Sequence, residues 1–182
     1  MELMSFESGK HGEKLCEMTD VEKRDRLLRT YSELCEEHFK GVPEVSSEEL
    51  LQILTHHDAG VRASIVLVDC RSEAEQSVSM LPGAVTMADL EQNLDELKDV
   101  ELIPYCAIGR RSGFFTKRIL EKNTGVKIRN HAGGILDWSH VEGPLVDRGT
   151  QHAIKQMHAG GANHLKHLPS SGKLEILLPK EV

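Results

Sequence analysis

The stretch CAIGRRS, residues 106–112, places a cysteine, a glycine and two arginines within a few positions of one another. The apolar segment 102–105 leads into it, and the segment 113–120 that follows carries apolar residues among basic ones. A side chain at the end of a parallel strand lies at the carboxyl edge of the sheet, where α/β folds place their sites. The stretch therefore predicts a junction between a strand and a helix, with a chemically active cysteine at that junction.

Short apolar runs alternate with segments of helical periodicity on both sides of this stretch. We expect strands at residues 44–45, 64–69, 100–105 and 126–129, a turn that feeds another short strand at residues 81–86, and helices at residues 46–56, 87–97 and 112–123. Strands that alternate with helices of about ten residues indicate βαβ units. The prediction is an α/β fold with a central, mostly parallel five-stranded sheet flanked by helices. Pro104 conflicts with this scheme, because a proline inside a strand cannot donate a ladder hydrogen bond.

Composition and periodicity divide the chain into successive parts. We expect a flexible tail at residues 1–18, an amphipathic helix at 19–41, the main domain at 43–148 and a partly ordered C-terminal extension at 149–182. The apolar stripe of the amphipathic helix includes Leu27, Leu28 and Leu34, which recur at helical spacing. This stripe predicts a helix that packs on the main domain or forms the seam of a homodimer.

The overall composition narrows the classes of partner. The net charge of −7, from 29 acidic and 22 basic residues, argues against nucleic acid and against an anionic membrane as the main partner. No apolar run approaches the roughly 20 residues of a membrane-spanning helix, and the N-terminal residues resemble neither a secretory signal nor a transit peptide. We therefore expect a cytoplasmic protein, in which Cys16, Cys35, Cys70 and Cys106 are free thiols.

The stretch CAIGRRS suits a nucleophilic cysteine. The N–H groups of a loop curled around the sulfur, the positive end of the next helix and the two arginines all favour a thiolate over a thiol. Glycine at position 109 permits the tight turn that such a loop needs. We expect Cys106 to be the nucleophile and the substrate to be held by Ala107, Ile108, Gly109, Arg110, Arg111 and Ser112. The alternative is a buried structural cysteine in a basic loop.

The stretch resembles the active loop of the rhodanese (thiosulfate sulfurtransferase-like) family, C-x-x-x-x-R, often written C-x-x-G-x-R-S. Four residues match that loop position by position, namely Cys106, Gly109, Arg111 and Ser112. Three other segments resemble further landmarks of the family and follow the same order, namely Asp69-Cys70-Arg71 with Glu75, Pro82-Gly83-Ala84, and Gly133-Gly134 with Trp138. The resemblance covers about residues 45–147. The chain departs from the family at Ser79-Met80-Leu81, where Gly-His-Ile is common.

The resemblance implies a rhodanese-like domain and an enzyme that transfers sulfane sulfur. Cys106 then takes sulfur from thiosulfate or another small-molecule donor, carries it as a persulfide, and passes it to a thiol or protein acceptor. Neither an organic cofactor nor a metal is expected. Asp69 and Glu75 are expected to support the loop, with Glu75 pairing with Arg71. Arg71 has two open roles, support of the loop or contact with an anionic donor.

Two other functions stay open. Cysteine phosphatases of similar fold carry C-x-x-x-x-x-R, and an arsenate-type reductase is a related alternative, but here the sixth residue after Cys106 is Ser112. Loop length therefore favours sulfur over phosphate. A non-catalytic domain that carries a persulfide or binds a protein is the alternative from another class.

Two further groups of side chains allow a functional interpretation. Cys70 is expected to be buried, with a resolving role as the alternative. His158, His164 and His167 suggest a metal site, but two glycines interrupt the segment and no cysteine or carboxylate completes a ligand set. We expect no metal there.

Overall fold

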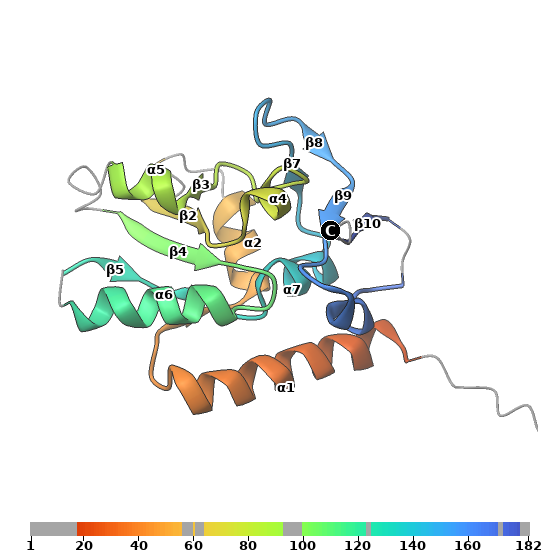
Figure 1. Ribbon diagram of the computed structural model, residues 1–182, viewed down its shortest axis with the longest axis horizontal. Helices are drawn as coiled ribbons and strands as arrows, with labels where there is room; N and C mark the ends of the chain where they lie inside the picture. The colour runs from red at the N-terminus through yellow and green to blue at the C-terminus, as the bar shows by residue number, and fades with distance from the viewer. Residues whose placement is uncertain are drawn as a thin grey trace, which may run out of the picture.

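A parallel sheet lies at the centre of the computed structural model, which describes residues 18–55, 60, 64–92, 100–122, 125–170 and 173–178. Its strands are β2 (Ile65–Asp69), β3 (Val85–Thr86), β4 (Glu101–Tyr105) and β5 (Lys127–Ile128). They lie in the order β3-β2-β4-β5, and each neighbouring pair is parallel (Figure 1). The α/β fold predicted from the alternation of strands and helices is confirmed.

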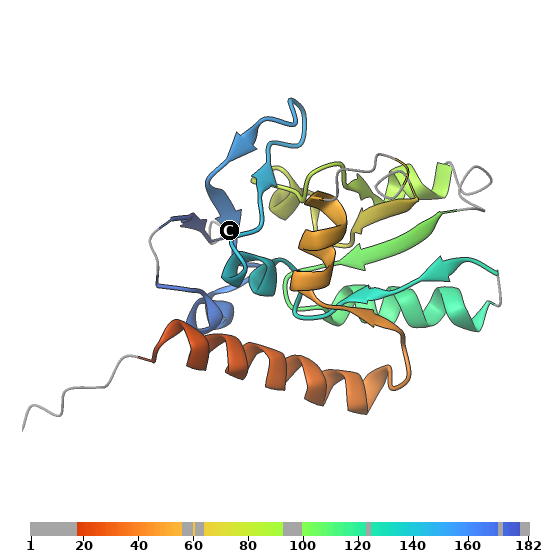
Figure 2. The ribbon, with the colours of Figure 1, turned by 180° about the vertical axis from the view of Figure 1, so that it is seen from behind.

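Helices cover both faces of this sheet. The helices of the main domain are α2 (Ser47–Thr55), α4 (Glu73–Gln76), α5 (Met87–Gln92), α6 (Arg110–Glu121) and α7 (Gly134–His140). Because successive side chains of a strand point to opposite faces, even-numbered and odd-numbered residues enter different clusters. Val68 and Leu102 pack with residues of α5 and α6, whereas Leu67 and Ile103 pack with residues of α2 and α7. Figures 1 and 2 show these two layers from opposite sides.

The strand expected at residues 44–45 does not join the main sheet. It forms β1 (Glu44–Val45), which pairs in parallel with β6 (Asn130–His131) as a separate ladder. The ladder between β4 and β5 ends with the pair of Leu102 and Ile128, and the chain that continues into β6 then takes β1 as its partner. Among the described residues the main sheet therefore has four strands rather than the expected five.

Pro104 is compatible with a central position in β4 because of the direction in which its nitrogen points. In β4, Glu101 and Tyr105 form hydrogen bonds toward the β2 side, with the carbonyl of Ser64 and the N–H of Cys70. Alternate residues face opposite neighbours, so the nitrogen of Pro104 faces the β5 side, where the ladder has already ended at Leu102. No ladder hydrogen bond is lost at Pro104.

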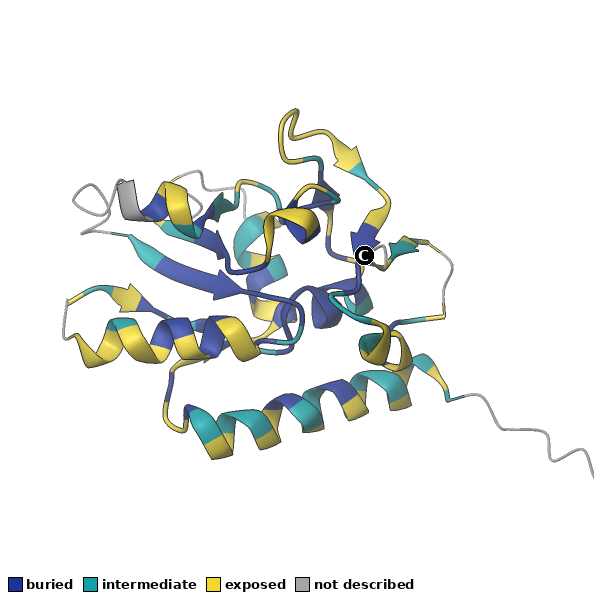
Figure 3. Ribbon diagram, in the orientation of Figure 1, coloured by how far each residue is buried: buried dark blue, intermediate teal, exposed yellow. Residues whose placement is uncertain are grey.

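Helix α1 (Asp20–His38) crosses the domain beside α6, α7 and the 3₁₀ helix η2 (Ala162–His167). Thr19 and Glu22 form the capping box at its start. Leu27 and Tyr31 are buried against the domain, while the opposite face of α1 is exposed (Figure 3). Arg24 anchors the helix to α7 through a 2.7 Å ion pair with Asp137. The stripe of α1 therefore packs on its own domain, as the first of the two expectations states.

The C-terminal extension folds onto the edge of the domain. Its strands are β8 (Ala153–Ile154), which pairs with β7 (Leu145–Val146), and β9 (Gln156–His158), which pairs with β10 (Glu175–Leu177). Met157, Ala159 and Leu168 belong to the same buried cluster as Ile103 of β4. The extension is thus part of the core and not an appendage.

Some expectations fall on residues outside the described set. These are the tail at residues 1–17, the end of the helix expected at 46–56 and the end of the helix expected at 87–97. Within the described ranges, no helix has the length and apolar character needed to cross a membrane.

Candidate active site

Cys106 follows β4 directly, as the sequence predicts, and α6 begins four residues later at Arg110. The side chain of Cys106 is buried, and the residue is only 1% exposed. Gly109 is the N-cap of α6 and has a φ of 85°, a left-handed conformation that glycine adopts at little cost. Residues 106–109 thus form a short loop that turns from the strand into the helix, which we call the Cys106 loop.

The N-terminus of α7 holds the Cys106 loop from one side. The N–H of Ile135 donates to the carbonyl of Cys106 at 2.9 Å, and the N–H of Leu136 donates to the carbonyl of Ala107 at 3.1 Å. A Cβ added at Gly134 would lie 2.3 Å from the Cys106 carbonyl oxygen. Only glycine therefore permits α7 to approach the loop so closely.

Helix α1 holds the loop from a second side. A Cβ added at Gly109 would lie 2.5 Å from the ring of Tyr31. Asn130 links these residues, since its Nδ2 donates to the Tyr31 hydroxyl at 2.9 Å and to the Gly109 carbonyl at 3.0 Å. Tyr31 in turn donates to Glu44 at 2.6 Å. These contacts leave no local signal in the sequence, because Tyr31 and Asn130 lie far from the loop along the chain.

The C-terminal extension covers a third side. A Cβ added at Gly160 would lie 2.9 Å from the Cβ of Ala107 and 3.3 Å from Oε1 of Glu75. His158 is buried nearby, and its Nδ1 accepts the N–H of Gly160 at 2.9 Å. Burial lowers the pKa of His158. The carboxylate of Glu75 acts to raise this pKa, and the charge of Arg111 acts to lower it. The extension therefore adds a buried imidazole beside the charged groups of the site.

Arg111 and Glu75 form the ion pair at the mouth of the loop. Both bonds of this bidentate pair measure 2.7 Å. Burial works to raise the pKa of Glu75, but hydrogen bonds from Arg111 and Ser72 outweigh it and hold that pKa at about 2. The hydrogen bonds to Glu75 raise the pKa of Arg111, and the sulfur of Cys106 acts in the same direction. Arg111 therefore lies between a fixed carboxylate and the cysteine.

The other predicted substrate-binding residues divide into inner and outer groups. Among the described residues, no hydrogen bond engages the N–H groups of Ala107, Ile108 and Gly109. The hydroxyl of Ser112 is buried and also lacks a partner within the described part of the chain. Arg110 instead points outward, with its guanidinium 5.9 Å from the centre of the Phe114 ring. Unpaired N–H groups at a strand-to-helix turn are typical of anion-binding loops.

Asp69 and Arg71 form a buried support next to the Cys106 loop. Asp69 accepts hydrogen bonds from Arg71, the shortest at 2.7 Å, and from the hydroxyl of Tyr105 at 2.5 Å. Arg71 also donates to the carbonyl of Ser79 at 2.5 Å, and its side chain is fully buried. Its Nη1 is buried without a hydrogen-bond partner among the described residues, so support of the loop and contact with an anionic donor both stay predictions for Arg71.

The predicted pair between Arg71 and Glu75 is wrong, because Glu75 pairs with Arg111. The prediction treated the two residues as one helical turn apart. Helix α4 begins only at Glu73, so Arg71 lies before the helix and turns back to Asp69, two residues upstream.

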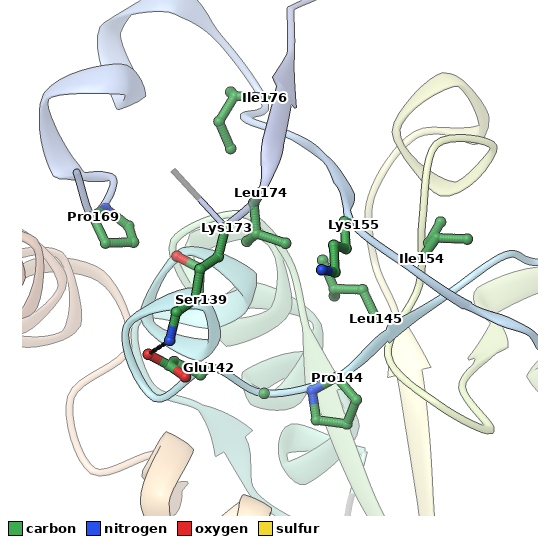
Figure 4. A pocket seen from close by; sticks show the side chains of 11 residues that line it. Ser139, Glu142, Pro144, Leu145, Ile154, Lys155, Pro169, Lys173, Leu174 and Ile176 are labelled. Atoms are coloured by element: carbon green, nitrogen blue, oxygen red, sulfur yellow. Dashed lines mark hydrogen bonds and ion pairs between the residues drawn. The ribbon is translucent and has the colours of Figure 1, made fainter. Parts of the chain in front are cut away.

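Two cavities lie near these elements. A groove of about 590 Å³ borders α6 and is lined by Cys70, Met87, Arg111, Phe114, Phe115, Lys117, Arg118 and Glu121. A second cavity of about 240 Å³ lies between the end of α7 and the extension (Figure 4). Leu145, Ile154 and Leu174 contribute to its apolar wall, and Glu142 pairs with Lys173 at its rim. Arg111, at the mouth of the Cys106 loop, lines the groove, whereas no residue of 106–109 lines the second cavity.

The three histidines considered as a metal site have separate hydrogen bonds. His158 accepts from Gly160, His164 Nδ1 lies 2.9 Å from the carbonyl of Ala159, and the carbonyl of His167 lies 2.7 Å from Nε2 of His140. In the residues that the structure describes, these side chains do not form a cluster with a third metal-ligating group.

The sequence and the structure were compared with known protein families and with solved structures. The sequence model of the rhodanese-like domain matches residues 46–141. The chain belongs to the rhodanese-like family. The match contains the Cys106 loop, the Asp69–Arg71 pair and α7, but neither α1 nor the C-terminal extension. No curated protein matches the chain.

One solved structure shows the same fold at low sequence identity, and two others are less similar. A thiosulfate sulfurtransferase from Pseudomonas aeruginosa is 20% identical with a TM-score of 0.53, and the match covers 75% of this chain and 25% of that one. This chain thus spans about a quarter of that relative's length. A rhodanese-like domain protein from Staphylococcus aureus is 26% identical (TM-score 0.43, covering 53% and 90% of the two chains). A Rhodopseudomonas palustris protein described as a possible tyrosine phosphatase is 17% identical (TM-score 0.48, covering 80% and 99%).

Proposed function

We propose that this rhodanese-like protein is a sulfurtransferase that carries a sulfane sulfur on Cys106. In the first step, the Cys106 thiolate attacks the outer sulfur of a donor such as thiosulfate. The bond between the two sulfurs of the donor breaks, sulfite leaves with its electron pair, and Cys106 becomes a persulfide. In the second step, a thiophilic acceptor attacks the outer sulfur of the persulfide and the Cys106 thiolate is regenerated.

The surroundings of Cys106 support this chemistry. Both steps keep negative charge at the loop, and the unengaged N–H groups of Ala107, Ile108 and Gly109 are available, within the described structure, to stabilise it. Helix α6 adds its positive end at Gly109. Arg111 supplies a fixed charge beside the sulfur because Glu75 holds its guanidinium in place.

Loop length is the observation that favours sulfur over phosphate. Arg111 is the fifth residue after Cys106, and α6 already begins at Arg110. A phosphate ester must bring its phosphorus to the sulfur with all its non-bridging oxygens held, whereas a sulfane donor needs only its outer sulfur to reach Cys106. The shorter loop suits the second requirement, and the phosphatase remains the second candidate for the test.

The decisive experiment combines intact-mass measurement with kinetics. We expect the wild-type protein to gain the mass of one sulfur atom on incubation with thiosulfate and to transfer it to cyanide. Cys106→Ser should fold normally and lose both properties, whereas Cys35→Ser, in α1, is the matched control and should keep both. Phosphatase turnover that depends on Cys106, without any persulfide on the protein, would overturn the proposal in favour of the second candidate.

A further inference from the structure

Cys70 lies beside Cys106 in the main sheet. Strands β2 and β4 are paired in parallel, and Asp69 is the partner of Tyr105 at the end of their ladder. Cys70 and Cys106 are the next residues of the two strands, and the N–H of Cys70 donates to the carbonyl of Tyr105 at 2.8 Å. The pairing therefore continues to the position where the two cysteines are neighbours.

The two side chains also point to the same face of the sheet. Cys70 and Cys106 belong to one apolar cluster with Val68, Leu102 and Phe115, and they are 4% and 1% exposed. Neighbouring strands lie about 4.7–4.9 Å apart, which is within the range of about 4.4–6.8 Å between the Cα atoms of a disulfide. Two thiols on the same face at this spacing can form a disulfide with little movement of the backbone.

We propose that Cys70 resolves the Cys106 persulfide, releasing hydrosulfide and closing a disulfide between Cys70 and Cys106. This inference rests on the proposed function, because the persulfide supplies the oxidised sulfur. The Cys70 thiolate attacks the Sγ atom of Cys106, and the bond from that atom to the outer sulfur breaks. The electron pair leaves with the outer sulfur as hydrosulfide, while the proton of Cys70 goes to the leaving group or to solvent. The sulfane sulfur is reduced and the two cysteines are oxidised. An external thiol then restores both cysteines by exchange.

The resolving reaction gives the protein a second activity, the release of sulfide from a sulfane donor when no acceptor is present. Burial raises the pKa of Cys70 above its ordinary value, and the charges of Cys106 and Asp69 add to this, while Arg111 and Arg118 oppose it. The reaction is therefore slow at neutral pH and faster as the pH rises. Because Cys70 also lines the groove along α6, a reducing thiol can approach the disulfide from that side.

The test follows the fate of the loaded sulfur. The protein is incubated with thiosulfate, separated from the donor and kept without acceptor, while free sulfide and intact mass are measured. We expect the wild type and Cys35→Ser to lose the added sulfur as sulfide and to yield a peptide pair that joins Cys70 to Cys106. In Cys70→Ser and Cys70→Ala the sulfur should stay on the protein until cyanide is added. Sulfide release at the wild-type rate in both Cys70 variants would overturn the proposal, as would a disulfide from Cys106 to Cys16 or Cys35.

A second arm separates this inference from the proposed function. The protein that has never met a sulfur donor is treated with diamide, an oxidant of thiols, and its disulfides are mapped. A bond between Cys70 and Cys106 in this arm supports the resolving pair. Failure of thiosulfate to load Cys106 would count against the proposed sulfur transfer but not against the pairing of the two cysteines. If the two cysteines stay reduced here while Cys35 is oxidised, the resolving pair is wrong.

Discussion

At the scale of single residues, the charges around Cys106 are arranged as two separate pairs. Asp69 and Arg71 form a buried pair that is closed by Tyr105, and Glu75 holds Arg111 at the mouth of the loop. The first pair is fully covered, whereas the Arg111 side chain keeps 44% of its exposure. Of the two arginines in these pairs, Arg111 is therefore the one that an incoming anion can reach, and Glu75 is the residue that fixes its position.

We expect Glu75→Gln to lower the free energy of unfolding most at neutral pH. The pKa of Glu75 is lowered from 4.5 to about 2 in the folded state, so its carboxylate stabilises the fold fully above pH 4.5. That contribution is lost as the pH falls toward 2. The loss in Glu75→Gln should be about 1.5–3 kcal/mol at pH 7, as for hydrogen bonds to charged groups.

Urea unfolding of the wild type and of Glu75→Gln at several pH values measures this effect. The difference in unfolding free energy should shrink as the pH falls from 4.5 toward 2. Glu73→Gln, in the same helix but with an exposed side chain, is the matched control and should change little. A difference between wild type and Glu75→Gln that stays constant down to pH 2 would contradict the assignment.

At the scale of elements, α1, α7 and the extension each pack closely against the Cys106 loop, and each of these contacts involves a glycine. The contact between α1 and the loop is the one that substitution isolates best. Gly109 has a φ of 85° and faces the Tyr31 ring, whereas Gly41 has a φ of 80° and nothing within 4 Å of its added Cβ. The two glycines therefore share a left-handed conformation but differ in crowding.

We expect Gly109→Ala to be more damaging than Gly41→Ala. Left-handed backbone in a residue other than glycine costs about 1–2 kcal/mol, and this cost applies to both variants. Gly109→Ala must in addition displace Tyr31 or the loop, which should lower stability further and reduce sulfur transfer. Thermal unfolding and the thiosulfate assay of both variants measure the two effects, and equal losses in the two variants would show that Tyr31 does not confine the loop.

Leu27 tests whether α1 belongs to the domain. It is fully buried in the main core cluster, so Leu27→Ala should cost about 2–5 kcal/mol of stability, as large-to-small core substitutions do. Val21→Ala, on the same helix at a residue that is 70% exposed, should cost far less. Denaturant unfolding together with solution mass checks this prediction. A stable Leu27→Ala protein with half the wild-type mass would instead favour the homodimer seam.

The sequence predicts the elements that are built from local patterns and misses the contacts made between distant ones. The strand before Cys106 and the helix after it follow from periodicity, and the predicted helix and its stripe reappear as α1. The local sequence pattern does not indicate which distant residues surround the loop, namely Tyr31, Asn130, His158 and Gly160. Periodicity predicts each strand separately and does not show which strand it pairs with, so all five were expected in one sheet. The partner of the two-residue strand β1 depends on where the β4–β5 ladder ends, because the chain after β5 continues into β6, which pairs with β1.

At the scale of the whole molecule, the rhodanese-like match stops at residue 141, but the core does not. Met157 and Leu168 of the extension are buried in the same cluster as residues of α2, β4 and α7. Hydrogen bonds also join the two ends of the described chain, since Asp20 accepts the N–H of Ser170 at 2.6 Å. The segments before and after the matched region therefore fold as one body with it.

Removal of residues 149–182 should therefore destabilise the protein and impair its site. Met157 and Leu168 should each contribute about 1.5–3 kcal/mol through burial, and the truncation also uncovers Ala107 and Glu75 beneath Gly160. Denaturant unfolding and sulfur transfer of the truncated and full chains measure the two effects. An unchanged midpoint together with unchanged transfer would show that the matched region is sufficient alone.

The glycines that surround the Cys106 loop have a consequence for whether the loop can change its length. A phosphatase-like loop is longer by one residue, and in an open site an insertion of that size only bulges outward. Here α7 closes on the Cys106 carbonyl at Gly134, Tyr31 stands against Gly109, and Gly160 lies against Ala107. An inserted residue has to push back three segments that are far apart in the sequence. We therefore expect that a single inserted residue would not convert the proposed sulfurtransferase into a phosphatase, because the packing around the loop opposes the longer loop.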